Sequence, residues 1–168
     1  MHRSEPGDRV RLLQEAADAQ LRQSFRDTPY PVYELRSPWF SPCALGESHR
    51  VDGSLQAVTL IYGPWEPGLA HVRVTTWHDL PGQDFRPDVP AALVAAPTEP
   101  VAVAVGGTTA PAAFAALPDS SWSLRVDQGP VHLLACGRGT IGDLAFERVT
   151  DLEPAVQARA HHLAALRA

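Results

Sequence analysis

The sequence predicts an α+β protein with an antiparallel or mixed sheet of about five to six strands and N- and C-terminal helices packed on one face. Three observations lead to this prediction. Residues 55–77 have the composition of a β-hairpin, the longest helical patterns lie at the two ends of the chain, and strand-like segments fill the middle. The 168 residues are 45% hydrophobic, which suits a single domain spanning 1–168.

The N-terminal segment has the pattern of an amphipathic helix. Apolar residues recur at helical spacing from Val10 to Leu21, with Arg and Gln between them. This helix should end before Pro29, because the residue that precedes a proline is forced out of the helical conformation. The prolines and aromatic residues that follow predict a short strand near 32–35 and then an ordered loop over 36–53.

Residues 55–77 contain two runs rich in Val, Thr, Ile and Tyr, separated by a loop dense in Gly and Pro. Side chains alternate across a strand, so Val72 and Val74 should share one face of the sheet. We expect the rest of the chain to cover this valine face and to leave the opposite face at least partly open. The opposite face carries His71, Arg73, Thr75 and Trp77.

The remaining elements follow from turn and cap residues. They are a brief helix over 88–96, a strand over 101–105, a helical turn or two over 109–117, a hairpin over 122–136, a strand over 144–149 and a final helix capped by Asp151. The passage over 79–100 is irregular and rich in Pro. We expect it to form either a lid over the open face or a clasp on a neighbouring subunit.

Composition excludes several functional classes. The formal charge of -5 and pI of about 5.7 are the opposite of a nucleic-acid-binding footprint, so no nucleic acid is expected as a partner. No apolar run is long enough to span a membrane or resembles a signal peptide, which predicts a cytoplasmic protein without a membrane partner. Cys43 and Cys136 are expected to be free, small buried residues, and no spacing of His or Cys indicates a metal site or a cofactor.

The open face is the first candidate site. His71, Arg73 and Trp77 from the first hairpin, joined by Arg125 from the second, would combine cationic donors with an aromatic surface. Such a surface suits a small anionic or aromatic ligand. The alternatives are a solvated face or a face covered by a second subunit.

Two further candidates rest on local motifs. Gly106, Gly107, Thr108 and Thr109 follow an apolar strand and precede the expected helix, an order that points free N–H groups at an anion. His78 and Asp79 place an imidazole beside a carboxylate, as an acid–base pair requires. The string Gly-Arg-Gly-Thr-Ile-Gly over 137–142 matches a dinucleotide motif, but too little chain follows it for the strand and acidic residue that such a site needs.

These observations favour a non-catalytic protein whose open sheet face mediates association, as a homodimer, or binds a small anionic or aromatic ligand. The alternative is a small enzyme that acts on an anionic substrate, with His78 and Asp79 as acid–base partners and the turn at Gly106 as the anion site. A third hypothesis is an assembly or regulatory partner of a larger enzyme.

Overall fold

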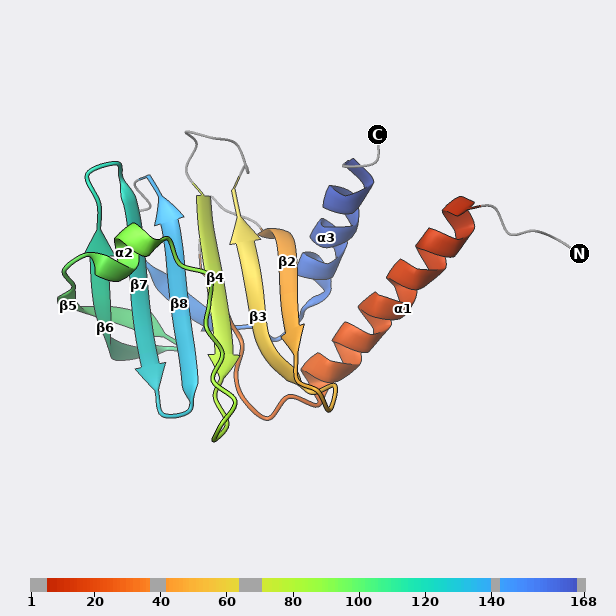
Figure 1. The fold of residues 1–168 in the computed structure, drawn as a ribbon, viewed down its shortest axis with the longest axis horizontal. Coiled ribbons are helices and arrows are strands. Elements are labelled where there is room, and N and C mark those ends of the chain that lie inside the picture. Colours follow the sequence, from red (N-terminus) through yellow and green to blue (C-terminus); the bar gives the residue numbers. More distant parts are fainter. Residues whose placement is uncertain (1–5, 37–41, 64–70, 140–142, 166–168) are drawn as a thin grey trace, which may run out of the picture.

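The computed structural model describes residues 6–36, 42–63, 71–139 and 143–165. Within these ranges nine strands form one sheet that curls into a half-barrel, accompanied by three helices (Figure 1). The predicted α+β fold with five to six strands is therefore wrong, because the protein is mostly β. The sheet is antiparallel throughout except where β5 pairs with β9 in parallel.

The sheet order brings strands from distant parts of the chain together. The helices are α1 (Pro6–Arg26), α2 (Ala91–Ala95) and α3 (Glu153–Ala165), and the strands are β1 (Tyr33–Leu35), β2 (Pro42–His49), β3 (Leu55–Tyr62), β4 (His71–His78), β5 (Glu99–Val105), β6 (Thr108–Ala116), β7 (Ser121–Gln128), β8 (Val131–Arg138) and β9 (Ala145–Arg148). Their order in the sheet is β1-β9-β5-β6-β7-β8-β4-β3-β2. The two hairpins β3–β4 and β7–β8, both predicted, meet where β4 pairs with β8.

The face of the sheet that carries Val72 and Val74, here called the inner face, forms the main core. Both valines are 0% exposed, as the alternation in β4 predicted. Leu21 of α1 and Val156 of α3 belong to the same apolar cluster, so both terminal helices contribute to this core. Trp122 of β7 also lies here, against a glycine on β8 that leaves room for its ring.

The opposite face, here called the outer face, is covered in part by residues 79–98, which we call the strap. Figure 1 shows α2 of the strap in front of β7. A second, smaller apolar cluster lies beneath the strap, and its members are Ala57, Trp77, Leu134 and Cys136, with Phe85 and Val89 packed against them. The strap thus lies over the sheet of its own chain.

The largest local error of the sequence analysis concerns 109–117, where a helix was expected. Gly106 and Gly107 both have positive φ, 59° and 81°, which is the geometry of a two-residue hairpin turn. The chain therefore returns as β6, in register with β5 from Val105↔Thr108 to Glu99↔Phe114. Pro111 is tolerated within this strand because β7 pairs with β6 only from Ala113 onward, so one side of β6 is unpaired there.

Residues 42–49, expected to lie in a loop, form the edge strand β2. A proline at its first residue and register shifts at both of its ends hid this strand from the alternation pattern. The helix at the N-terminus is confirmed, and it ends at Arg26 before Pro29. The final helix is also confirmed, and the Asp151 carboxylate accepts a hydrogen bond from the Glu153 N–H at 2.9 Å.

Candidate functional site

Strand pairing arranges the outer-face side chains in rows across β4, β8 and β7. One row consists of His71, Arg138 and Ser121, which are consecutive cross-strand partners. The next row consists of Arg73, Cys136 and Ser123. Directly opposed residues in antiparallel strands have Cβ atoms about 5 Å apart, so each row brings three side chains together.

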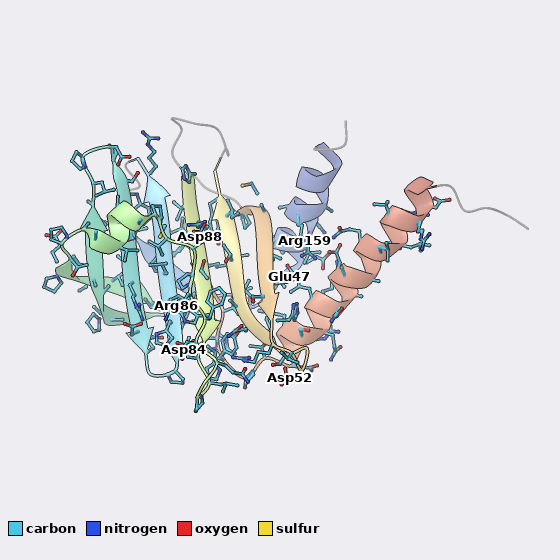
Figure 2. All side chains as sticks on the ribbon, viewed as in Figure 1. Glu47, Asp52, Asp84, Arg86, Asp88 and Arg159 are labelled. Carbon is cyan, nitrogen blue, oxygen red and sulfur yellow. The ribbon has the colours of Figure 1, made fainter. Side chains whose placement is uncertain are left out.

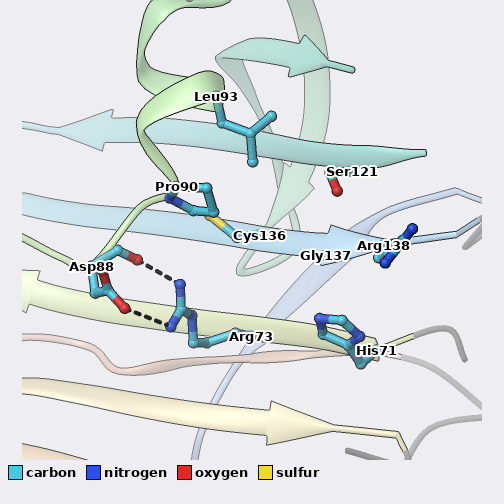
Figure 3. A pocket seen from close by; sticks show the side chains of 9 residues that line it. All are labelled: His71, Arg73, Asp88, Pro90, Leu93, Ser121, Cys136, Gly137 and Arg138. Carbon is cyan, nitrogen blue, oxygen red and sulfur yellow. Dashed lines mark hydrogen bonds and ion pairs between the residues drawn. The ribbon is translucent and has the colours of Figure 1, made fainter. Parts of the chain in front are cut away.

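A pocket of about 370 Å³ lies where these two rows meet the strap. The sheet supplies five side chains and Gly137, and the strap supplies the rest (Figure 3). The lining residues are His71, Arg73, Asp88, Pro90, Leu93, Ser121, Cys136, Gly137 and Arg138. The pocket lies where β4 begins and β8 ends, beside the N-terminal end of β7.

The two arginines of the pocket differ in their partners. Arg73 donates to the Asp88 carboxylate at 3.4 Å and to the Asp88 backbone carbonyl at 2.5 Å, so its charge is compensated. Arg138 donates through Nε to the backbone carbonyl of Asp119 at 3.3 Å. No carboxylate lies within ion-pair distance of Arg138 among the residues that the structure describes. The Asp119 carboxylate accepts hydrogen bonds from Ser121, which lower its pKa, and the charge of Arg138 lowers that pKa further. The Arg138 charge is therefore balanced only at a distance, without a close ion pair.

Cys136 is a buried thiol on the floor of the pocket. Burial raises its pKa above the ordinary thiol value, and the nearby Arg73 guanidinium offsets only part of this effect. The thiol is therefore neutral at physiological pH and acts as a small apolar group. Burial also raises the pKa of the half-buried Cys43, and both cysteines are free.

The remaining residues of the predicted open face lie outside this pocket. Trp77 is 2% exposed, its ring stacks on the His132 ring with centroids 5.1 Å apart, and it is tilted against Phe85 of the strap. Arg125 lies over the Trp77 ring, with Cζ 5.7 Å from its centroid, and donates to Asp127 at 3.0 Å. Trp77 is thus a packing residue beneath the strap and offers no ring face to a ligand from solvent.

The structure separates His78 from Asp79. The His78 side chain stacks on Tyr30 with ring centroids 5.0 Å apart, on the other side of β4 from the strap. Asp79 instead lies 3.3 Å from Nε2 of His132, whose Nδ1 is 2.6 Å from Asp127. Both nitrogens of His132 are occupied by carboxylates, which leaves no free ring nitrogen to act as a general base.

The turn at Gly106 and Gly107 is no helix N-terminus, because β6 follows it. A Cβ at Gly106 would contact the ring of Tyr33, a member of the inner-face core. Asp79 instead contacts His132 on the outer face. Thr108 satisfies its hydroxyl locally by donating to the Val105 carbonyl at 3.0 Å.

No known family, curated protein or solved structure matches this chain. Within the described ranges, no three His, Cys, Asp or Glu side chains form a group that would hold a metal ion. No helix in the described part of the chain combines the length and apolarity needed to cross a bilayer. The string over 137–142 lies partly outside the described residues, and a strand follows it.

Sequence reasoning missed Arg138, Asp88 and Ser121 as members of a site. Alternation in β8 does place Arg138 on the same face as Cys136. The pairing of β4 with β8, however, joins strands that are far apart in the chain, and no local pattern indicates which residue lies opposite His71.

The stacked pair of His78 and Tyr30 predicts a pH effect on stability. Burial, followed by the Arg50 charge, lowers the pKa of His78 below its ordinary value of 6.5. The folded state therefore disfavours the charged imidazolium of His78. The contribution of neutral His78 to the free energy of unfolding is complete above the pKa of His78 in the unfolded chain, and it is lost as the pH falls through the lower pKa of His78 in the folded protein. Substituting His78→Phe keeps the ring stack and should reduce the loss of stability between pH 8 and pH 5 in urea titrations. The exposed His161→Gln should retain the wild-type loss, and equal pH profiles for all three proteins would contradict the prediction.

Proposed function

We propose that this protein binds a small anionic ligand in the pocket between the strap and strands β4, β8 and β7. The observation that carries this proposal is the row of His71, Arg138 and Ser121, in which an arginine that makes no close ion pair among the described residues lies beside an imidazole and a hydroxyl. Guanidinium groups bind carboxylate and phosphate oxygens through charge-assisted hydrogen bonds. The volume of about 370 Å³ is within the range of small-molecule sites.

Two other hypotheses from the sequence find less support. The strap occupies part of the outer face, which leaves less of that face for a second subunit. An acid–base reaction would need a free titratable side chain near the bound anion, whereas His78 and Asp79 point to different partners. Binding of a small anion in the pocket requires neither a fully open outer face nor an acid–base pair of His78 and Asp79.

The test is isothermal titration calorimetry with inorganic phosphate and with acetate at low ionic strength. We expect both anions to bind the wild-type protein, and Arg138→Ala to weaken binding by about tenfold or more, as expected for loss of one charge-assisted hydrogen bond. Arg86→Ala is the matched control, because Arg86 is an exposed arginine on the strap that does not line the pocket (Figure 2).

The two variants carry the same net charge, so any difference between them reports the position of the arginine and not the overall charge. Arg86→Ala should bind both anions as the wild-type protein does. Absence of binding to wild-type protein, or equal losses in the two variants, would refute the proposed site.

A further inference from the structure

The walls of the pocket differ in polarity from one end to the other. The row of His71, Arg138 and Ser121 forms the end at the strand termini. The part beneath α2 is formed by Pro90, Leu93 and the neutral thiol of Cys136. Figure 3 shows this separation, with Arg138 and His71 on one side of the view and Pro90 above Cys136 on the other.

The part beneath α2 is apolar and also carries no net charge. Leu93 is 4% exposed, and its side chain points from α2 toward the sheet (Figure 3). Arg73, the one cation in this part of the lining, is paired with Asp88 of the strap. Cys136 belongs to the apolar cluster that continues under the strap through Trp77 and Leu134. A small anion without an apolar group would make no apolar contact with the part of the pocket beneath α2.

The distance between the two rows sets the length of a ligand that contacts both. Same-face neighbours along β8, such as Arg138 and Cys136, are two residues apart, or about 7 Å. A bare phosphate or acetate at Arg138 is too short to reach Cys136 and Leu93. A chain of a few methylene groups attached to the anionic group covers this distance.

We propose that the ligand of this pocket is an amphipathic anion, a short-chain carboxylate whose head group binds Arg138 and Ser121 and whose aliphatic chain packs against Cys136, Pro90 and Leu93. This inference rests on the proposed function, since it names the class of ligand for the same site. It adds that the ligand is selected by its apolar chain as well as by its charge.

The experiment is a calorimetric series with acetate, butanoate and hexanoate, and with inorganic phosphate as an anion that has no chain. Affinity should rise by about two- to fourfold for each added methylene group that becomes buried. Leu93→Ala should weaken hexanoate binding by about tenfold while leaving acetate and phosphate unchanged. Retained acetate binding also shows that the variant keeps the pocket intact.

Val94→Ala is the matched control, because Val94 is the next residue of α2 and is 70% exposed. It should bind hexanoate as the wild-type protein does. Equal affinity for all three carboxylates, or the same loss in both α2 variants, would overturn the inference while leaving the anion site in place.

The two proposals fail in different ways. If no anion binds, or if hexanoate binds equally well to Arg138→Ala, the proposed function fails and this inference fails with it. If phosphate and acetate bind through Arg138 but chain length has no effect, only the amphipathic ligand is refuted.

Discussion

Substituting Arg159→Met should lower the free energy of unfolding by about 3 kcal/mol, the low end of the range for breaking a buried ion pair. Arg159 of α3 donates to Glu47 of β2 at 2.6 Å and to Asp18 of α1 (Figure 2 labels Arg159 and Glu47). The three side chains are only 11–20% exposed. Without the guanidinium, two carboxylates remain close together, largely out of water and without a counter-charge.

Urea denaturation followed by circular dichroism measures this loss. The control is Arg22→Met, which removes an ion pair between the same two helices, with Glu153 at 2.8 Å. Its side chains are 36% and 40% exposed, so the loss should stay below about 1 kcal/mol. Similar small losses in both variants would show that the cluster around Arg159 contributes little to stability.

Substituting Trp77→Ala should cost about 3–5 kcal/mol, as expected for removal of a buried tryptophan. Its indole fills the space between the outer face and the strap, in contact with Phe85 and the His132 ring. Removing it deprives the strap of its main apolar contact. We therefore expect faster cleavage by chymotrypsin after Phe85 under native conditions, as well as a lower urea midpoint.

The matched control is Trp122→Ala, because Trp122 is a tryptophan of similar burial on the inner face. It should destabilise the protein by a similar amount without exposing the strap. If chymotrypsin cleaves both variants after Phe85 at the same rate, cleavage follows global unfolding and the role assigned to Trp77 is wrong.

The spacing of apolar residues predicted those strands and helices whose conformation is indicated by their own sequence. Two hairpins were predicted because Val72 and Val74 alternate with polar residues in β4, and Leu124 and Val126 do so in β7. The N-terminal helix was predicted because apolar residues from Val10 to Leu21 recur at helical spacing, and Pro29 was used to place its end. In each case the spacing of apolar residues within the segment carries the information.

The strand count was underestimated because the missed strands depend on their neighbours. The alanine-rich residues of β6 have high helical propensity, and the two-glycine turn together with pairing to β5 overrides it. β2 is held as a strand by its pairing with β3. These pairings join consecutive strands, but the alternation pattern within β6 or β2 alone does not reveal them.

In the candidate site, too, some residues could be predicted from alternation within one strand and others could not. His71 and Arg73 were predicted from alternation alone, and both line the pocket. The position of Trp77 beneath the strap depends on where residues 79–98 run, which no periodic pattern specifies. Arg138 enters the site only through the register of β4 with β8.

The order of strands also has a consequence for synthesis on the ribosome. β1 emerges long before β9, and among the described strands it pairs only with β9, through Tyr33↔Arg148 and Leu35↔Phe146. β9 is in turn the neighbour of β5. The nascent chain therefore holds β1 without its hydrogen-bonding partner until residue 148 has left the exit tunnel. Because chains fold as they are synthesised and distant pairings form slowly, this edge of the sheet should close last.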